Sequence, residues 1–137
     1  MKDDIKKLES KRKSLHEKLA DLGDFRRGTI SVIYRKCGKK NCACAMPGHP
    51  GHGPQYLWNT TIKGRSYAKN LKMGAELHKV MKETDNHRIF QNLCDEIVQT
   101  NEKICELRPV PEVTDESEAE RLKKKLQNRF RKKYKKK

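Results

Sequence analysis

The 137-residue sequence has few large apolar side chains: 34% of its residues are hydrophobic, three are Phe and one is Trp, whereas 37% are charged. Such a composition predicts one thin domain without a large globular core. No apolar run approaches the roughly 18 residues that span a bilayer, and the segment Met1–Asp4 lacks the apolar stretch of a secretory signal. We therefore expect an elongated cytoplasmic protein that does not enter a membrane.

Acidic residues are absent from residues 26–72, which contain ten Lys and Arg residues. The net charge of +15 is therefore unevenly distributed, because residues 73–120 have a net charge of −7 and residues 121–137 carry eleven basic residues without an acidic one. A surface selected only for solubility commonly mixes the two signs. Two cationic blocks separated by an anionic one predict a polyanionic partner.

The usual signs of a catalytic site are also missing from the sequence. There are no paired carboxylates near the cysteines, no glycine-rich loop that could cradle phosphates, and no nucleophile with a plausible adjacent base. We therefore expect a protein that is not an enzyme.

Three of the five cysteines fall within the short stretch CGKKNCAC, as Cys37, Cys42 and Cys44. In a reducing cytosol, short-spaced cysteines are more often metal ligands than disulfide partners. His49 or His52 would complete the four ligands of a structural zinc ion. The alternative is a set of reduced thiols in a loop rich in Gly and Pro. We predict a structural Zn²⁺ ion.

Two segments have the apolar periodicity of amphipathic helices. The first seam has Arg12 in one slot and otherwise consists of Ile5, Leu8, Leu15, Leu19 and Leu22. The second seam lies within residues 74–107 and consists of Phe90, Leu93, Ile97, Thr100, Ile104 and Leu107. The simplest arrangement is an antiparallel pair of helices within one chain. A coiled coil between two chains, which would make a homodimer, is the alternative.

Residues 29–69 have the pattern of short β-strands. The β-branched and aromatic runs TISVIY, QYLWNTTI and RSYAK surround the cysteine cluster, and Lys63-Gly64 has the composition of a tight turn. So small a sheet needs a metal ion or packing against helices to be stable.

The predicted fold is thus mainly α with a small zinc-stabilised β module. Its segments are an N-terminal amphipathic helix (1–25), a zinc-binding β module (26–72), a long amphipathic helix (73–108), an acidic linker (109–120) and a basic tail (121–137). Because the like charges of the tail repel one another, we expect the tail to be disordered until it binds a partner.

The run from Arg26 to Leu71 resembles the core of a family of small uncharacterised prokaryotic proteins, sometimes encoded near transposase genes. The family shares an RGS-type start, a YRKCG-x3-CxC cluster, and an HGPYY element followed by a Gly-Lys/Arg turn and a helix. The likeness covers roughly residues 5–107 and implies that His52, in His52-Gly53-Pro54, is the histidine ligand. Gln55 departs from the pattern, because the family has an aromatic residue there, and the resemblance brings no established activity.

The charge pattern favours a nucleic-acid-binding accessory protein, directed to DNA rather than RNA and associated with the nucleoid. The residues expected to contact nucleic acid are all basic: Arg26, Arg27, Arg35, Lys36, Lys39, Lys40, Lys63, Arg65, Lys69, Lys72, Arg129, Arg131, Lys132 and Lys133. The aromatic residues among them, Tyr34, Tyr56, Trp58 and Tyr67, stack on bases or form the core of the module. Two alternatives remain, an adaptor for a protein such as a transposase and a protein bound to structured RNA or ribosomes.

Overall fold

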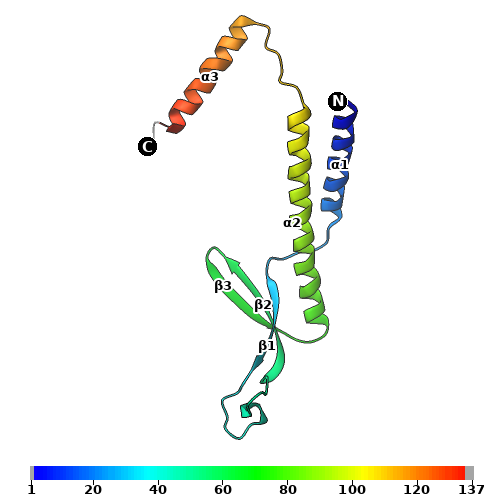
Figure 1. The fold of residues 1–137 in the computed structure, drawn as a ribbon, viewed down its shortest axis with the longest axis vertical. Helices are drawn as coiled ribbons and strands as arrows, with labels where there is room; N and C mark the ends of the chain where they lie inside the picture. Colours follow the sequence, from blue (N-terminus) through cyan, green and yellow to red (C-terminus); the bar gives the residue numbers. More distant parts are fainter. Residues whose placement is uncertain (1, 135–137) are drawn as a thin grey trace.

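The structure, a computed structural model, describes residues 2–134. Within this range the chain forms three α-helices, one short 3-10 helix and one three-stranded antiparallel sheet. The elements follow one another as α1 (Lys2–Asp21), β1 (Thr29–Arg35), η1 (Ala43–Ala45), β2 (His52–Ile62), β3 (Arg65–Leu71), α2 (Ala75–Leu107) and α3 (Glu116–Tyr134) (Figure 1). The predicted combination of helices with a small sheet is confirmed.

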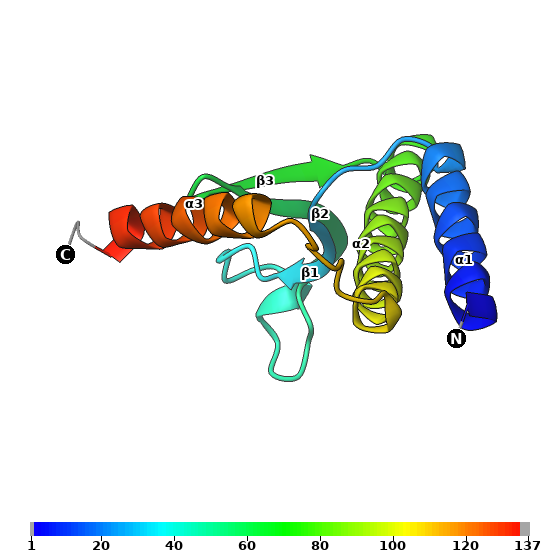
Figure 2. The same ribbon diagram turned by 90° about the horizontal axis from the view of Figure 1, so that it is seen from above.

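Helices α1 and α2 lie side by side and antiparallel, and α2 extends beyond α1 to lie beside the sheet (Figures 1 and 2). Their seam buries Leu15, Leu93 and Ile104. The polar slot in the first seam is also explained, because Arg12 Nη1 donates a hydrogen bond to Asn101 Oδ1 of α2 at 2.8 Å. Apart from residue 1 and residues 135–137, no helix has the length and apolarity required to cross a membrane.

The sheet has the order β1-β2-β3, so β2 is the central strand. Strands β2 and β3 are joined at Lys63 and Gly64, whose φ angles of 51° and 79° are both positive, as a tight turn of this kind requires. One face of the sheet lies opposite the N-terminal half of α2, where Ile30, Val32 and Tyr56 share a cavity of about 280 Å³ with Leu77 and Met81. The sheet and the long helix therefore face each other across this cavity.

An ion-pair cluster connects the start of the β module to α2. Arg26 Nη2 lies 2.9 Å from Glu83 Oε1, and Lys79 Nζ lies 2.7 Å from the other oxygen of the same carboxylate. The Arg26 guanidinium also lies over the ring of Trp58, 4.9 Å from its centroid. The hydrogen bond from Lys79, together with the charge of Arg26, lowers the pKa of the Glu83 carboxyl. Arg26, one of the residues predicted to contact nucleic acid, is thus partly covered and paired with a carboxylate.

The basic tail differs from the prediction, because residues 116–134 form helix α3 instead of a disordered segment. Asp115 caps this helix, since its Oδ1 accepts hydrogen bonds from the Ser117 amide at 3.0 Å and the Ser117 hydroxyl at 2.9 Å. Acidic residues in the first turn and basic residues in the last turn also suit the helix dipole. The cap and the charge distribution along the helix oppose the repulsion among the lysines. Residues 135–137 of the predicted tail lie outside the described residues.

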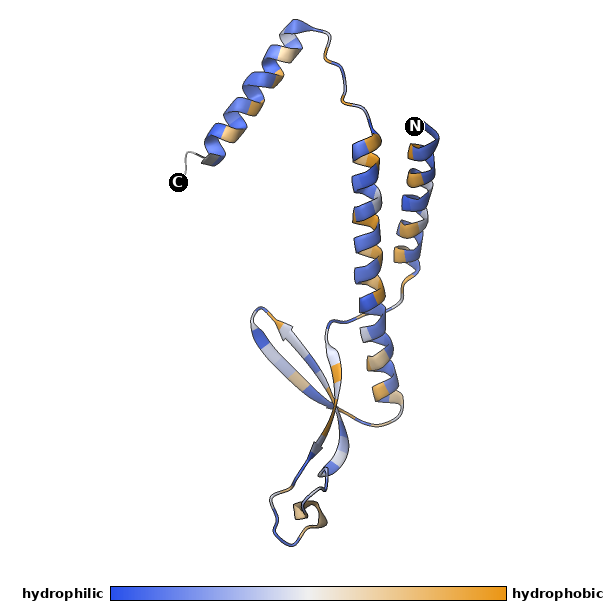
Figure 3. Cartoon of the chain, viewed as in Figure 1, coloured by the Kyte–Doolittle hydropathy of each residue, from blue (hydrophilic) through white to orange (hydrophobic). Residues whose placement is uncertain are grey.

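Helix α3 begins inside the predicted acidic linker and lies apart from α1, α2 and the sheet (Figure 1). Its surface is predominantly hydrophilic (Figure 3). Leu122, Leu126 and Phe130, spaced four residues apart, are 46%, 42% and 52% exposed. The stability of α3 therefore comes from its caps and its local charges, not from burial.

Candidate metal centre

The loop between β1 and β2 carries the cysteine cluster at one end of the molecule (Figure 1). The antiparallel register of the two strands pairs Arg35 with His52, the first residue of β2. Because Cys37 follows Arg35 by only two residues, the sheet brings the first and last predicted ligands together. The strands therefore close the loop that holds the other two cysteines.

Tight turns position Cys42 and Cys44. The Cys42 amide donates to the Lys39 carbonyl at 3.3 Å, and the Ala45 amide donates to the Cys42 carbonyl at 3.0 Å at the start of η1. These turns direct Cys44 inward, where it is 1% exposed, the most buried side chain of the module. The Cys44 thiol is therefore enclosed by the loop, whereas most of the other loop side chains are exposed.

The ligand atoms of Cys37, Cys42, Cys44 and His52 all lie within 4.8 Å of one another. The sulfur atoms of Cys37 and Cys44 are 3.5 Å apart, and the Cys42 sulfur lies 3.1 Å from His52 Nε2. A tetrahedral ion with metal–sulfur bonds of about 2.3 Å would separate its sulfur ligands by about 3.8 Å. The Cys3His group therefore fits a tetrahedral metal ion.

The surroundings of the cluster favour the metal-binding thiolate at Cys37 and disfavour it at Cys44. The Lys39 backbone amide, then the side chains of His52 and Cys44, lower the pKa of the Cys37 thiol from 9.0 to about 6. The Cys37 amide donates to the Cys44 sulfur at 3.4 Å and lowers the pKa of that thiol, but burial and the neighbouring thiols outweigh this effect and raise it. A cation among these sulfur atoms would stabilise both thiolates.

The residue spacing allows either His49 or His52 as the fourth ligand, and the structure brings His52 into the cluster. His49 lies outside it and accepts a hydrogen bond through Nδ1 from the Gly51 amide at 2.9 Å. Gly51 itself has a φ of +106°, and a Cβ at this position would lie 2.6 Å from the Arg35 carbonyl carbon. This close passage allows His52 to begin β2 beside the end of β1.

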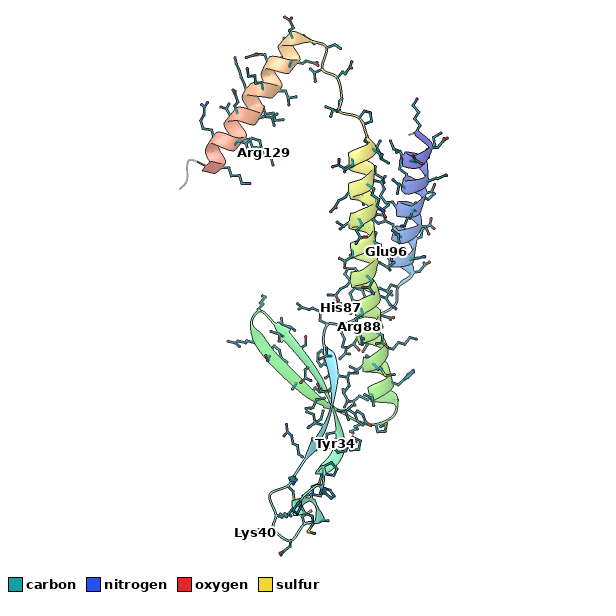
Figure 4. The ribbon with its side chains drawn as sticks, viewed as in Figure 1. Tyr34, Lys40, His87, Arg88, Glu96 and Arg129 are labelled. Carbon is teal, nitrogen blue, oxygen red and sulfur yellow. The ribbon has the colours of Figure 1, made fainter. Side chains whose placement is uncertain are left out.

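The predicted nucleic-acid-binding residues lie in three separate regions. Lys36, Lys39 and Lys40 lie in the loop between β1 and β2 that carries the Cys3His group, and Lys40 and Arg129 are far apart (Figure 4). A second region is the sheet with its adjoining loops, and the third is α3. Apart from Arg26, which is partly covered, these residues are exposed: Arg27, Arg35, Lys36, Lys39, Lys40, Lys63, Arg65, Lys69, Lys72, Arg129, Arg131, Lys132 and Lys133.

The four aromatic residues of the module divide into two pairs. Tyr56 and Trp58 are partly covered, and the Trp58 Nε1–H donates to the Arg27 carbonyl at 2.9 Å. Tyr34 and Tyr67 are 48% and 49% exposed. The first pair is thus half-buried within the module, whereas the second pair is exposed.

Sequence reasoning missed Glu83, the buried acid that holds Arg26 and Lys79. It lies on the predicted long helix among other acidic residues, and no local pattern distinguishes it from them. Its partner Arg26 precedes it by more than fifty residues, so only the packing of the module on α2 reveals the pair.

A family model described as a domain of unknown function (DUF6788) matches residues 5–73. The matched segment extends from α1 through β3 and includes all four residues of the Cys3His group, but it ends before α2. No curated protein and no solved structure matches the chain.

Proposed function

The chain belongs to the DUF6788 family, and because this description names no activity, we propose from the site itself a zinc-stabilised nucleic-acid-binding accessory protein directed to DNA. The observation that carries the proposal is the Cys3His group at the end of a module with ten basic residues and no acidic one. The metal ion fixes the shape of the module, and the cations bind phosphates.

The metal ion in this proposal is zinc, and its role is structural. Three thiolates and one imidazole suit Zn²⁺, and four protein ligands leave no open position for a reacting water. Residues 26–72 also supply no carboxylate that could act as a general base. The gain from the metal is the stability that the small sheet lacks by itself.

The polyanion in this proposal is a nucleic acid. Exposed cations occur at the metal-binding loop, on the sheet and along α3, so an extended ligand with regularly spaced phosphates suits them better than a compact anion. Binding releases counterions and therefore weakens steeply as salt increases. The resemblance to proteins encoded near transposase genes supports DNA as the ligand and a link to a mobile element. The corresponding location is the cytoplasm, at the nucleoid.

A titration of metal-loaded protein against duplex DNA, single-stranded DNA and RNA at two salt concentrations tests this function. Arg35→Ala and Arg65→Ala should each weaken binding of the preferred ligand by about 1–3 kcal/mol and affect a random sequence less. Lys39→Ala and Lys40→Ala are matched charge-removing controls and should weaken both ligands alike. Binding no tighter than that of a polylysine peptide to the same three ligands would refute the proposal.

A protein-interaction adaptor is the second candidate, and the exposed apolar line Leu122, Leu126 and Phe130 of α3 favours it. The seam of α2, by contrast, is already covered by α1 of the same chain, which leaves less apolar surface for a homodimeric coiled coil. If the adaptor function holds, Leu126→Asp abolishes partner binding while Arg35→Ala and Arg65→Ala have no effect. Preferential binding of RNA in the titration would instead support the ribosome-associated alternative.

A further inference from the structure

The free end of the β2–β3 hairpin forms one side of a groove. Thr29, the first residue of β1, pairs with Asn59 of β2. Strand β2 continues to Ile62, so residues 60–62 pair only with β3. A groove of about 550 Å³ lies beside this end of β2, where β1 no longer pairs with it. Arg27, Thr60, Thr61, Tyr67 and His87 are among the residues that line it. The volume lies within the roughly 300–1,000 Å³ of typical ligand clefts.

His87 reaches the groove from α2, on the side that faces the hairpin (Figure 4). Two phenylalanines support its ring, since the His87 centroid lies 6.0 Å from that of Phe25 and 6.3 Å from that of Phe90. Phe25 and Phe90 themselves stack with their centroids 4.7 Å apart. The imidazole is therefore part of a fixed aromatic group instead of a lone surface side chain.

The backbone beside the groove is also fixed. The Arg27 carbonyl accepts the hydrogen bond from Trp58, and Gly28 follows with a φ of +124°. A Cβ on Gly28 would lie 2.3 Å from Trp58 Nε1, so the chain passes directly against the indole. The exposed Arg27 side chain thus starts from a rigid point at the edge of the groove.

The groove combines three kinds of chemistry. Tyr67 offers an exposed ring, Arg27 offers a permanent cation, and the free edge of β2 at Thr60 and Thr61 offers backbone amide and carbonyl groups. Among the described residues that line the groove, none is acidic. This combination suits a ligand that has a flat ring, a polar edge and an anion.

We propose that this groove binds one unpaired nucleotide of a single-stranded nucleic acid. The base stacks on Tyr67, with His87 on the opposite side, the phosphate lies on Arg27, and the free backbone groups at the edge of β2 bind the edge of the base or the sugar. Because every base has a stacking face, the site tolerates different sequences. This inference rests on the proposed function and specifies the state of the nucleic acid at this site.

Two other ligands fit the groove less well. An extended peptide would add to the free edge of β2, but that edge is only three residues long, residues 60–62, and offers few backbone hydrogen bonds. Duplex DNA presents the edges of its bases in a groove and keeps their faces stacked, so a ring such as that of Tyr67 gains no contact with a base face. A splayed nucleotide uses all three kinds of chemistry.

The test compares two tyrosines of equal exposure. Tyr67→Ala removes the ring in the groove, and Tyr34→Ala removes a ring that lies near the other end of β1, outside the groove (Figure 4). The probes are oligothymidylate, oligouridylate and a DNA duplex of the same length, with metal content and thermal melting measured to confirm that each variant is folded. Stacking of one base contributes about 1–3 kcal/mol, so Tyr67→Ala should weaken single-strand binding about 5- to 150-fold. Tyr34→Ala should leave it unchanged, and duplex binding should be the same in both variants.

A fluorescent base analogue within the oligothymidylate reports stacking directly. The wild-type protein and Tyr34→Ala should quench it, and Tyr67→Ala should not. Equal single-strand affinity and equal quenching in the two variants would overturn the groove as a nucleotide site while the proposed function stands. Absence of binding to all three probes by the wild-type protein would refute the proposed function, and this inference with it. The oligouridylate arm decides between RNA and DNA as the source of the nucleotide.

Discussion

Replacing the two loop histidines one at a time tests the metal centre most sharply. His52 and His49 lie three residues apart in one Gly/Pro-rich loop, but only His52 has its ring nitrogen among the cysteine sulfurs, with Nε2 3.1 Å from Cys42 Sγ. Each variant removes one imidazole from the same segment. His49→Ala is therefore a matched control for His52→Ala.

The expected magnitudes differ widely. Structural zinc in small modules binds with an apparent free energy of about 10–16 kcal/mol, so one ligand of four corresponds to about 3 kcal/mol, or about 100-fold in affinity. His49 makes one hydrogen bond, from the Gly51 amide at 2.9 Å. A hydrogen bond of this kind contributes about 1 kcal/mol, which limits the effect of His49→Ala to about fivefold.

Competition with a chromophoric chelator measures the affinity of each variant for Zn²⁺. The fluorescence of Trp58, the one tryptophan of the chain, gives a second readout because it lies on β2, the strand that begins with His52. Chelation should change this signal in the wild-type protein as the β module loses order. An equal loss of affinity in the two variants, or a larger one in His49→Ala, would refute the assignment of the fourth ligand.

Three further predictions concern pH, the ion-pair cluster and α3. Because the pKa of Cys37 is lowered to about 6, protons compete with a metal ion for this thiolate only below about pH 6, whereas the raised pKa of Cys44 allows competition at higher pH. The loss of Zn²⁺ affinity on acidification, followed by chelator absorbance, should therefore become steeper near pH 6. Arg26→Ala leaves the largely buried Glu83 carboxylate with fewer partners and should lower the free energy of unfolding, measured in urea, by about 1–3 kcal/mol. Replacement of the exposed Arg65 by Ala should not lower it. Equal stabilities of the two variants would contradict the role of the Arg26–Glu83 pair. Deleting residues 121–137 removes eleven cations and should make the slope of log affinity against log salt concentration shallower, without changing the preference among nucleic-acid sequences. Loss of that preference would show that α3 helps to discriminate between sequences.

The basic blocks illustrate how charge along a sequence differs from charge in space. Residues 26–72 form one cationic block in the sequence, but the fold separates Lys40 at the metal-binding loop from Lys63 at the far turn of the hairpin, and it pairs Arg26 with Glu83. The composition of a segment fixes its net charge. It does not fix which side chains remain free, because that depends on partners distant in the chain.

The sequence by itself determined the features that depend on local spacing. The seam of Leu15, Leu93 and Ile104 follows from helical periodicity, the turn at residues 63–64 from its glycine, and the Cys3His set from short ligand spacing. Each of these signals lies within a few residues of the chain. They were sufficient for the two helical seams, for the hairpin turn and for the set of candidate metal ligands.

Tertiary structure alone decided the rest. The register of Arg35 with His52 closes the metal site, the step at residues 60–62 creates the groove, and the packing of the module on α2 pairs Arg26 with Glu83 and brings His87 beside Tyr67. These contacts join residues that the sequence separates by between about twenty and sixty positions. Their formation depends on strand register and on how a small sheet lies against a long helix, and no periodicity within either segment specifies that geometry.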